Sequence, residues 1–467
     1  MLPMLMLATV VKFIFICVEV ILLFNLLILV HELGHFLAAR WRGLVVEKFA
    51  IWFGKPIWSR KIGGVEYRLG SIPAGGFVAI PQLAPMEALE GDTESDRAKL
   101  PPVKPLDKII VAAAGPVFSL GLAFAMACIV WVVGKPESEI DSTMIGYVKE
   151  GGPAAVSGLK VGDRIVSVDG HPVKHFMSGT DSVKWRIVRS EGETIPFVVE
   201  RDGQEVTVNS TWTKPETASW RRPALREIQV GPHVPPGVNF VVRGSPGEQA
   251  GLQTGDLIVS ANGQKIFNLD EMGPLVTANA GGKLDLVVAR QGQEVPITLT
   301  LPAADPAKPN AIVNLGIEWG RISFAHPDPF TQVKDAATSI FRMVGALFSA
   351  KSDVKAAHFS GPLGIMKIYY QVFETDYGWR LALSLSVLIN VNLALLNLLP
   401  FPVLDGGHIV LAIVEAIRRK PINIRVLEVV QTACAMLLIG FMLYVTFFDI
   451  GDFFGNHPVP EQTQKAE

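Results

Sequence analysis

Four long and mostly apolar runs define the pattern of this chain. They cover residues 13–30, 109–133, 381–399 and 426–448. Each is close to the roughly 20 residues that a helix needs to cross the hydrocarbon core of a bilayer. No small-residue cleavage site follows the first run, so we expect it to be retained rather than removed as a signal peptide. The pattern predicts a polytopic α-helical membrane protein with four transmembrane helices.

Lys and Arg gather in two of the segments between these runs. The segment after the first run contains Arg40, Arg42, Lys48, Lys55, Arg60, Lys61 and Arg68, and the segment after the third contains Arg418, Arg419, Lys420 and Arg425. Because basic residues are enriched in cytoplasmic loops, both segments are expected to be cytoplasmic. The long segment from about residue 134 to 378 and both termini are then expected on the outer side.

The long outer segment contains an internal repeat. The sequence around Gly158 aligns without a gap on the sequence around Gly251, an offset of 251 − 158 = 93 residues. Each copy predicts a short helix with a Gly C-cap, a Gly-Asp turn and a β-rich run. The copies resemble two PDZ domains, which are α+β folds. Such domains bind an extended peptide beside an exposed strand, so we expect either docking of peptide tails at the PDZ grooves or a steric filter against bulky folded proteins.

Composition agrees with a membrane protein. Mean hydropathy is +0.35, and 49% of residues are hydrophobic while 18% are charged, which is too apolar for an ordinary soluble enzyme. The net charge of −2 provides no basic field, so no nucleic-acid partner is expected. Cys17, Cys128 and Cys434 all lie in apolar runs and indicate no disulfide framework.

Candidate metal chemistry begins where the first apolar run ends, at His31-Glu32-Leu33-Gly34-His35. Two His at positions i and i+4 share one helical face and can both bind Zn²⁺, while the Glu can take a proton from a water that the metal activates. A site that keeps one position open for water needs a third protein ligand.

A candidate third ligand, Asp405, follows the third run in the segment from Asn397 to His408. Ionisable groups at or near membrane depth are costly and therefore usually functional. The alternative interpretation is a Pro-Asp-Gly turn that only ends the helix. His408 is a competing ligand.

Together, the two motifs resemble the site-2 proteases, which are intramembrane zinc metalloproteases. Four spans with two PDZ copies between the second and third resemble the bacterial regulator of sigma-E protease type. The resemblance implies that His31, His35 and Asp405 bind Zn²⁺ and that Glu32 is the catalytic base. It also implies single-span membrane proteins as substrates, such as an anti-sigma factor or signal-peptide remnants, and a bacterial inner-membrane location with the PDZ domains on the periplasmic side.

The residues after the metal motif also resemble that family. Residues 64–78 read as strand segments separated by Gly and Pro and are similar to the family's membrane re-entrant β-loop. An exposed strand there could hold an unwound substrate by β-addition, so Tyr67 and Leu69 are assigned to substrate binding. Asn392 and Asn397 can pair with an unwound backbone, although contact between helices is an alternative role.

Two positions depart from the family pattern. Trp52 stands where the family has the first Gly of a Gly-x-Gly sequence, and Ser119 stands where it has an Asn. A Ser hydroxyl can still form a hydrogen bond but reaches less far. We expect these changes to affect substrate preference and loop packing more than the chemistry.

The expected domain organisation follows from these segments. The parts are a first transmembrane helix with the metal motif (1–43), a cytoplasmic loop with a re-entrant β-hairpin and a solvated linker (44–108, the linker at 85–105), a second transmembrane helix (109–134), PDZ-like domains (135–225 and 226–303), a linker with an amphipathic helix at 330–348 on the outer membrane surface (304–378), a third transmembrane helix with the Asp405 motif (379–408), a basic cytoplasmic loop (409–425), a fourth transmembrane helix (426–450) and an outer tail (451–467).

Two alternatives come from other functional classes. The chain could be a catalytically inactive membrane scaffold that binds proteins through its PDZ copies, but an intact Glu32 argues against this. It could also be a membrane zincin of another lineage with a Glu as the third ligand, but the element from Asn397 to Asp405 argues against that.

Overall fold

The computed structural model describes residues 2–83, 100–138, 142–177, 179–218, 221–234, 236–303, 315–320, 322–349, 352–375, 377–419 and 424–454. The chain forms two compact units. The helical unit comprises residues 1–135, 325–341 and 360–449, and the repeat unit comprises residues 136–324, 342–359 and 450–467. Most of the linker expected at 85–105, and the tail beyond residue 454, lie outside the described residues.

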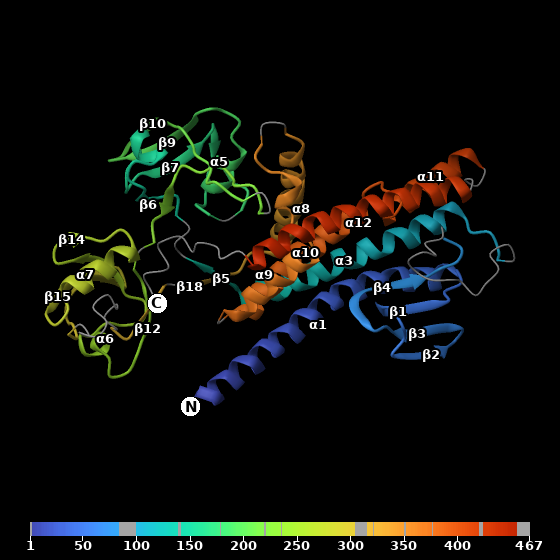
Figure 1. Cartoon of the computed structure of the whole chain (residues 1–467), viewed down its shortest axis with the longest axis horizontal. Helices are drawn as coiled ribbons and strands as arrows, with labels where there is room; N and C mark the ends of the chain where they lie inside the picture. The colour runs from blue at the N-terminus through green and yellow to red at the C-terminus, as the bar shows by residue number, and fades with distance from the viewer. Residues whose placement is uncertain are drawn as a thin grey trace. The chain divides into compact units, whose positions relative to one another are not determined.

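Long helices form the helical unit (Figure 1). They are α1 (Leu2–Arg42), α3 (Pro105–Val133), α9 (Pro362–Glu374), α10 (Gly378–Asn397), α11 (Asp405–Arg418) and α12 (Ile424–Phe454). Helix α1 packs on α3, α3 packs on α10 and α11, and α9 packs on α1 and α10. Among the described residues, four helical stretches are long and apolar enough to cross a membrane: Val10–Arg42, Pro105–Val133, Gly378–Asn397 and Val429–Asp452. The four expected spans are confirmed as such helices.

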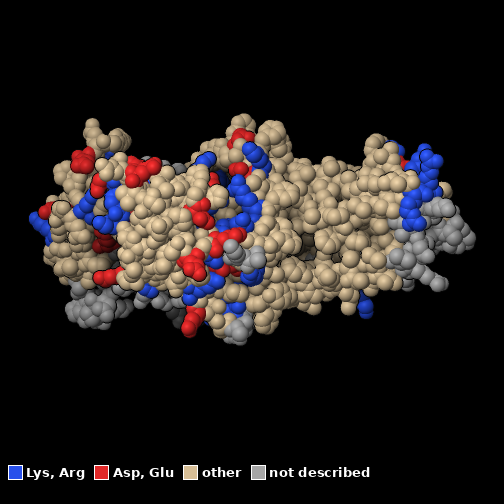
Figure 2. Space-filling view, turned by 90° about the horizontal axis from the view of Figure 1, so that it is seen from above, with Lys and Arg blue, Asp and Glu red and all other residues tan. Residues whose placement is uncertain are grey.

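The long helices expose large apolar side chains. Phe15, Leu22, Val132 and Leu437 are each more than half exposed. The face drawn in Figure 2 shows few charged side chains over a long stretch of the surface. Apolar surface of this extent is unfavourable in water, so these helix faces are suited to contact with lipid.

The C-terminus of α1 places both histidines inside a continuous helix. The helix continues past residue 30 as far as Arg42. Gly43 then adopts a φ of 75°, and the N–H of Leu44 donates to the carbonyl oxygen of Ala39 at 2.9 Å. A left-handed Gly with such a return bond is a common helix C-cap. His31 and His35 are therefore held one turn apart by regular helical hydrogen bonds.

A four-stranded sheet follows α1, where the sequence predicted a hairpin. Its strands are β1 (Lys48–Phe53), β2 (Trp58–Ile62), β3 (Val65–Leu69) and β4 (Ile72–Ala79), in the order β2-β3-β1-β4. Strand β1 pairs parallel to β3 and antiparallel to β4. Strands β1 and β2 were not expected, because the Lys and Arg residues of this segment indicated only its cytoplasmic side.

Trp52 lies at an irregularity in this sheet. The pairing of β1 with β4 shifts register between Ile51 and Phe53, and Trp52 adopts a φ of 69°. This left-handed region is one that Gly occupies easily and a bulky residue rarely does. The position where the resembling family has a Gly thus keeps a Gly-like backbone here despite its large side chain.

The third apolar run is not one helix through the Asp405 motif, which corrects the expected span of 379–408. Helix α10 ends at Asn397, and α11 begins at Asp405. Pro400 and Pro402 have no N–H to donate, so a helix cannot continue regularly through them. The basic loop expected over 409–425 is also wrong in part, because residues up to Arg418 are helical.

Helix α9 was not expected, and Asp449 explains how it begins. The N–H groups of Gly361 and Gly364 both donate to Asp449 Oδ2 at 3.0 Å. Asp449 lies on α12 and is buried. A carboxylate at a helix N-terminus satisfies unpaired N–H groups and interacts well with the helix dipole, so this contact ties α12 to the start of α9.

The amphipathic helix expected at 330–348 forms as α8 (Pro329–Phe348). Its first part, through residue 341, belongs to the helical unit. There Val333 and Ala336 pack with Ala123 of α3 and Val391 of α10. Its last residues belong to the repeat unit.

Two copies of one α+β fold form the repeat unit. The first contains β6 (Ile145–Val148), α4 (Pro153–Ser157), β7 (Arg164–Val168), β8 (His171–Pro172), α5 (Val183–Arg189), β9 (Ile195–Arg201), β10 (Gln204–Ser210) and β11 (Val230–Pro232). The second contains β12 (Val238–Val241), α6 (Pro246–Gln249), β13 (Leu257–Ala261), β14 (Gln264–Lys265), the 3-10 helix η2 (Leu269–Glu271), α7 (Met272–Ala278), β15 (Lys283–Arg290), β16 (Gln293–Thr300) and β17 (Ile317–Trp319). Strand β5 (Lys135–Ser138) pairs with β18 (Ile322–Ala325), and the 3-10 helix η3 (Ala356–His358) follows α8.

The copies share sheet order and a buried ion pair. The strand order is β8-β7-β9-β10 in the first sheet and β14-β13-β15-β16 in the second, and the strands correspond one to one in this order. In the first, Arg201 binds Asp163 at 2.7 Å and also donates to the carbonyl oxygen of Gly158. In the second, Arg290 makes the equivalent contacts with Asp256 and Gly251. The internal repeat seen in the sequence is therefore a repeat of structure.

Both expected domain boundaries are wrong at their C-terminal ends. Strand β11 pairs with β6 and Ile228 belongs to the first core, so the first copy extends past residue 225 to Pro232. Strand β17 pairs with β12 and Leu315 belongs to the second core, so the second copy extends past residue 303 to Trp319. In each copy the last strand returns to pair with the first, a long-range contact that local patterns do not reveal.

Candidate metal centre

The metal motif occupies one buried face of α1. His31 is 7% exposed, and His35 is also largely buried. Their positions at i and i+4 place the two rings on the same side of the helix. The ring Nε2 atoms of His31 and His35 lie 3.3 Å apart.

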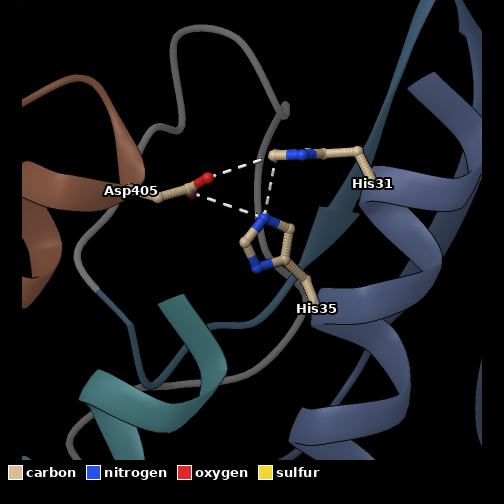
Figure 3. Close-up of side chains that lie close together, drawn as sticks. All are labelled: His31, His35 and Asp405. Carbon is tan, nitrogen blue, oxygen red and sulfur yellow. Dashed lines mark hydrogen bonds and ion pairs between the residues drawn. The ribbon is translucent and has the colours of Figure 1, made fainter. Parts of the chain in front are cut away.

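Asp405 reaches these rings from the start of α11 (Figure 3). Its Oδ2 lies 3.2 Å from Nε2 of His31, and its Oδ1 lies 3.4 Å from Nε2 of His35. The three ligand atoms lie within 4.8 Å of one another. Among the residues that the structure describes, these three form the cluster of His, Cys or acidic side chains that could hold a metal ion.

Two glycines allow α11 to start this close to the preceding loop. A Cβ at Gly406 would collide with the carbonyl group of Leu398, and a Cβ at Gly407 would collide with that of Phe401. The Asp-Gly-Gly sequence is therefore required by close backbone approach, and it fixes where the Asp405 carboxylate points.

Contacts to α3 orient both imidazoles. Nδ1 of His35 donates to the carbonyl oxygen of Val111 at 2.8 Å, because that oxygen can only accept. Nδ1 of His31 lies 3.0 Å from the hydroxyl of Ser119, which is fully buried. A partner that holds one ring nitrogen fixes the ring orientation and raises the basicity of the other. The His35 ring is thus turned so that its Nε2 faces His31 and Asp405.

This arrangement fits a cation. The Nε2 atoms and carboxylate oxygens converge with like-signed partial charges, and Asp405 Oδ2 is buried without a well-aligned hydrogen-bond donor. Such a group is costly unless a cation or proton compensates it. Two imidazoles and one carboxylate form a donor set that zinc uses in catalytic sites with an open fourth position.

A cavity of about 300 Å³ opens beside the cluster. Its lining includes Glu32, which follows His31 on α1, and His408, one turn after Asp405 on α11. The rest of the lining includes Phe53, Gly76, Phe77 and Val78 of the sheet and Leu393 and Asn397 of α10. Glu32 therefore shares a cavity with the three candidate ligands.

The residues expected to bind substrate separate into two groups. Asn397 lines the cavity, and its Nδ2 lies 3.3 Å from Nε2 of His31. Asn392 lies one turn and a half earlier on α10; its Oδ1 is buried without a hydrogen-bond partner, and it is not part of the lining. The structure thus brings Asn397 to the cluster but not Asn392.

Tyr67 and Leu69 lie away from the cavity, which corrects their assignment. Both belong to β3, which is paired on one side with β2 and on the other with β1. An interior strand cannot accept an added strand. Tyr67 instead packs its ring against Phe36 and Phe49. The cavity is bordered by β4, an edge strand of the sheet, and this order could not be read from local sequence.

Sequence reasoning also missed the contacts that orient the ligands. Ser119 was noted only as a departure from a family pattern, and Val111 was not singled out because its functional atom is a backbone carbonyl. The helical spacing of eight residues between Val111 and Ser119 was the available signal, since it places them on one face of α3.

Comparison with known proteins agrees with this site. Residues 19–441 match the model of Peptidase family M50. The chain is 30% identical over 447 residues to a putative zinc metalloprotease of Neisseria meningitidis, covering 91% of this chain and 97% of that relative. It is also 30% identical over 461 residues to the regulator of sigma-E protease RseP of Escherichia coli, covering 91% and 96%. A putative zinc metalloprotease of Treponema pallidum is 28% identical over 436 residues, covering 88% and 93%.

The family match extends over nearly the whole chain, so it includes both the metal motif and the Asp405 element. It therefore excludes a zincin of another lineage, and the names of the relatives support an enzyme rather than an inactive scaffold. The chain belongs to peptidase family M50, the site-2 protease family, and is a zinc-dependent intramembrane metalloprotease of the bacterial inner membrane.

Proposed function

We propose that His31, His35 and Asp405 bind the zinc ion and that Glu32 is the general base and acid of peptide hydrolysis. The observation that carries this proposal is the convergence of three ligand atoms within 4.8 Å beside a cavity that Glu32 also lines. Ser119 and Val111 hold the opposite ring nitrogens, so both imidazoles direct their Nε2 atoms toward the cluster.

Zinc bound there would polarise the scissile carbonyl and lower the pKa of a water molecule. Glu32 lines the same cavity and would take a proton from a water molecule there and later return it to the leaving amine nitrogen, because one carboxylate can serve as base and then as acid. Asn397 contributes an amide group at the same position, with Nδ2 3.3 Å from the ring of His31. Its N–H can donate to the substrate carbonyl oxygen as negative charge develops there.

The substrate that this site favours is an unwound segment of a single-span membrane protein. A transmembrane helix uses its own backbone groups for hydrogen bonds, so its peptide bonds become accessible only when the helix opens. Edge strand β4 contributes Gly76, Phe77 and Val78 to the cavity wall. An extended substrate can add beside such an edge through main-chain hydrogen bonds.

The two structural copies of the repeat unit are PDZ-like modules in this proposal, located on the periplasmic side. The orientation rests on the Lys and Arg residues that flank the first and third spans. The modules dock peptide tails or exclude bulky folded proteins, so substrates are shortened on the outer side before they reach the membrane site. An anti-sigma factor or a signal-peptide remnant has the required single span.

The decisive experiment co-expresses the Glu32→Gln form with a tagged single-span substrate. Loss of cleavage with normal zinc content is expected, because the amide keeps the shape but cannot accept the proton. Glu19→Gln changes a carboxylate on the same helix that lies outside the cavity lining and should retain activity. Equal cleavage by the Glu32→Gln and unaltered forms would contradict the proposal. Full stoichiometric zinc in Asp405→Ala would remove Asp405 from the ligand set.

A further inference from the structure

The segment that follows α8 packs into the first copy of the repeat unit. Val354 is 2% exposed and lies in an apolar cluster with Val188 of α5 and Ala346 of α8. Trp185, Leu225 and Met343 complete this cluster. The side chain of Val354 therefore fills a pocket between α5, Leu225 before β11 and the last turns of α8.

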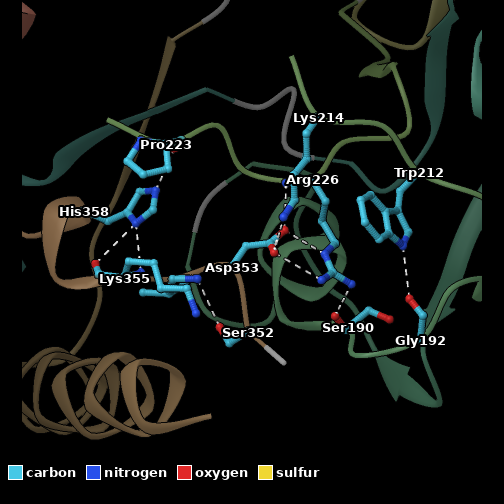
Figure 4. A network of polar contacts seen from close by, with 11 residues as sticks. Ser190, Gly192, Trp212, Lys214, Pro223, Arg226, Ser352, Asp353, Lys355 and His358 are labelled. Carbon is cyan, nitrogen blue, oxygen red and sulfur yellow. Dashed lines mark hydrogen bonds and ion pairs between the residues drawn. The ribbon is translucent and has the colours of Figure 1, made fainter. Parts of the chain in front are cut away.

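The neighbouring residue, Asp353, is held by an unusually complete set of donors (Figure 4). Its Oδ2 accepts from the backbone N–H of Arg226 at 3.1 Å and from Nε of Arg226 at 2.8 Å. Its Oδ1 accepts from Nη2 of Arg226 at 3.2 Å and from Nζ of Lys214 at 2.6 Å. Asp353 is 8% exposed and Arg226 is 6% exposed.

The carboxylate pocket is itself fixed by the first copy. The ring of Trp212 lies 4.5 Å from the guanidinium carbon of Arg226 and 5.4 Å from Nζ of Lys214. Nε1 of Trp212 donates to the carbonyl oxygen of Gly192 at 3.0 Å, and Nη1 of Arg226 donates to that of Ser190. The two cations are thus positioned by residues around the end of α5.

A backbone N–H and two cations for a carboxylate, next to a pocket for one aliphatic side chain, are the features that recognise the C-terminus of a peptide. A buried ion pair contributes little net stability compared with an apolar replacement, so stability alone is a weak explanation. The Asp353 side chain supplies a carboxylate and Val354 supplies the aliphatic group, as a peptide ending in a free carboxylate would.

We infer that Asp353 and Val354 are an internal ligand that occupies the peptide groove of the first copy and competes with an incoming peptide that has an aliphatic C-terminal residue and a free carboxylate. This inference rests on the proposed docking function of the repeat unit, and not on the hydrolytic chemistry. Residues 352–358 lead directly into α9 in the sequence, so a peptide that displaces them releases the chain segment that precedes that helix.

The size of the effect follows from the competition. If the internal ligand leaves the groove free for about one tenth of the time, the apparent affinity for an external peptide falls about tenfold. Removing the carboxylate of Asp353 should therefore raise the apparent affinity for the external peptide about tenfold, provided that Arg226 remains to bind the carboxylate of that peptide.

The test uses the full-length protein in detergent and a fluorescent peptide ending in Ser-Val with a free carboxylate. The same peptide with a C-terminal carboxamide is the ligand control. Asp353→Ala is expected to bind the free-acid peptide about tenfold more tightly than the unaltered chain, and Arg226→Ala combined with it should abolish binding. Glu205→Ala is the matched protein control, because Glu205 is an exposed carboxylate of β10 in the same copy.

Outcomes of this test separate the inference from the docking function. If Asp353→Ala and the unaltered chain bind the free-acid peptide with equal affinity, the inference is wrong but the docking function stands. If neither protein binds the peptide, both the inference and the docking function are wrong. Because Asp353→Ala could destabilise the domain, hydrogen exchange of residues 352–358 in the unaltered chain gives a second measurement. Saturating free-acid peptide should increase exchange there, and unchanged protection at saturation would contradict displacement.

Discussion

Gly115 of α3 lies directly against the imidazole of His35, so a Cβ at this position would fall inside van der Waals contact with Nε2. Val111, one turn earlier on the same helix, accepts the Nδ1 hydrogen of that ring at 2.8 Å. One face of α3 therefore both orients the ring and leaves room for it. This makes α3, which contains none of the motif residues, part of the metal centre.

Gly115→Ala is expected to lower zinc content, because the added methyl group displaces a ligand nitrogen. Gly121→Ala is the matched control: it lies on the same helix, and a Cβ there meets nothing within 4 Å. Ala is favoured over Gly inside a helix by roughly 0.5–1 kcal/mol, so the control should be at least as stable as the unaltered chain. Metal analysis of purified proteins, together with thermal unfolding, checks both. Full zinc occupancy in Gly115→Ala would contradict the geometry.

Ser119→Ala is expected to weaken zinc binding by about 10- to 100-fold, the usual effect of removing a group that orients a metal ligand. The Ser119 hydroxyl lies 3.0 Å from Nδ1 of His31. Ser386→Ala removes another buried hydroxyl, whose oxygen lies 2.8 Å from that of Tyr369. Neither residue belongs to the cluster, so this variant should keep the original affinity for zinc. Competition with a chromogenic chelator measures both constants, and equal affinities would show that Ser119 does not orient the ring.

Local sequence patterns were sufficient for the four spans and for placing His31 and His35 together on one helix face. Long apolar runs and the i, i+4 spacing are local signals, and they determine which helix face carries the ligands. Asp405 needed the family resemblance, since no local pattern shows that it meets α1.

The remaining features depend on contacts between distant segments. The parallel pairing of β1 with β3 places β3 in the interior of the sheet and leaves β4 at its edge. The last strand of each repeat pairs with the first strand of the same copy, which lies far away in the sequence. Asp353 lies in a segment that was expected to be a linker. Its local sequence does not indicate that a buried Arg from another part of the chain binds it. Tertiary partners, rather than local propensity, decided these elements.

Gln431→Leu is expected to reduce turnover about fivefold, the equivalent of one ordinary hydrogen bond of about 1 kcal/mol. Gln431 is a buried residue of α12, and its Nε2 donates to the carbonyl oxygen of Pro402 at 3.3 Å, in the loop that leads to Asp405. Leu437→Ala, at a position that is 72% exposed on the same helix, should leave turnover unchanged. A steady-state assay that separates kcat from KM is the measurement. A change confined to KM would assign Gln431 to substrate binding instead of to positioning of the loop.

Asp353→Asn is expected to destabilise the repeat unit at neutral pH and to lose this effect in acid. Burial alone would raise the pKa of the Asp353 carboxyl, but hydrogen bonds from Arg226 and Lys214 outweigh it and lower the pKa to about 2. A carboxyl whose pKa is lower in the folded state contributes stability that is fully present above its unfolded pKa of about 3.9 and is lost as the pH falls through the folded value.

The shift corresponds to roughly 2 kcal/mol, so the free energies of urea unfolding of the variant and the unaltered chain should differ by about that amount at pH 7 and converge as the pH falls below about 4. Asp285→Asn changes an exposed carboxylate that accepts from Thr298 at 2.8 Å and should leave the free energy of unfolding at pH 7 close to that of the unaltered chain. A gap between Asp353→Asn and the unaltered chain that stayed constant down to the folded pKa would mean that the carboxylate charge is not what holds this segment in place.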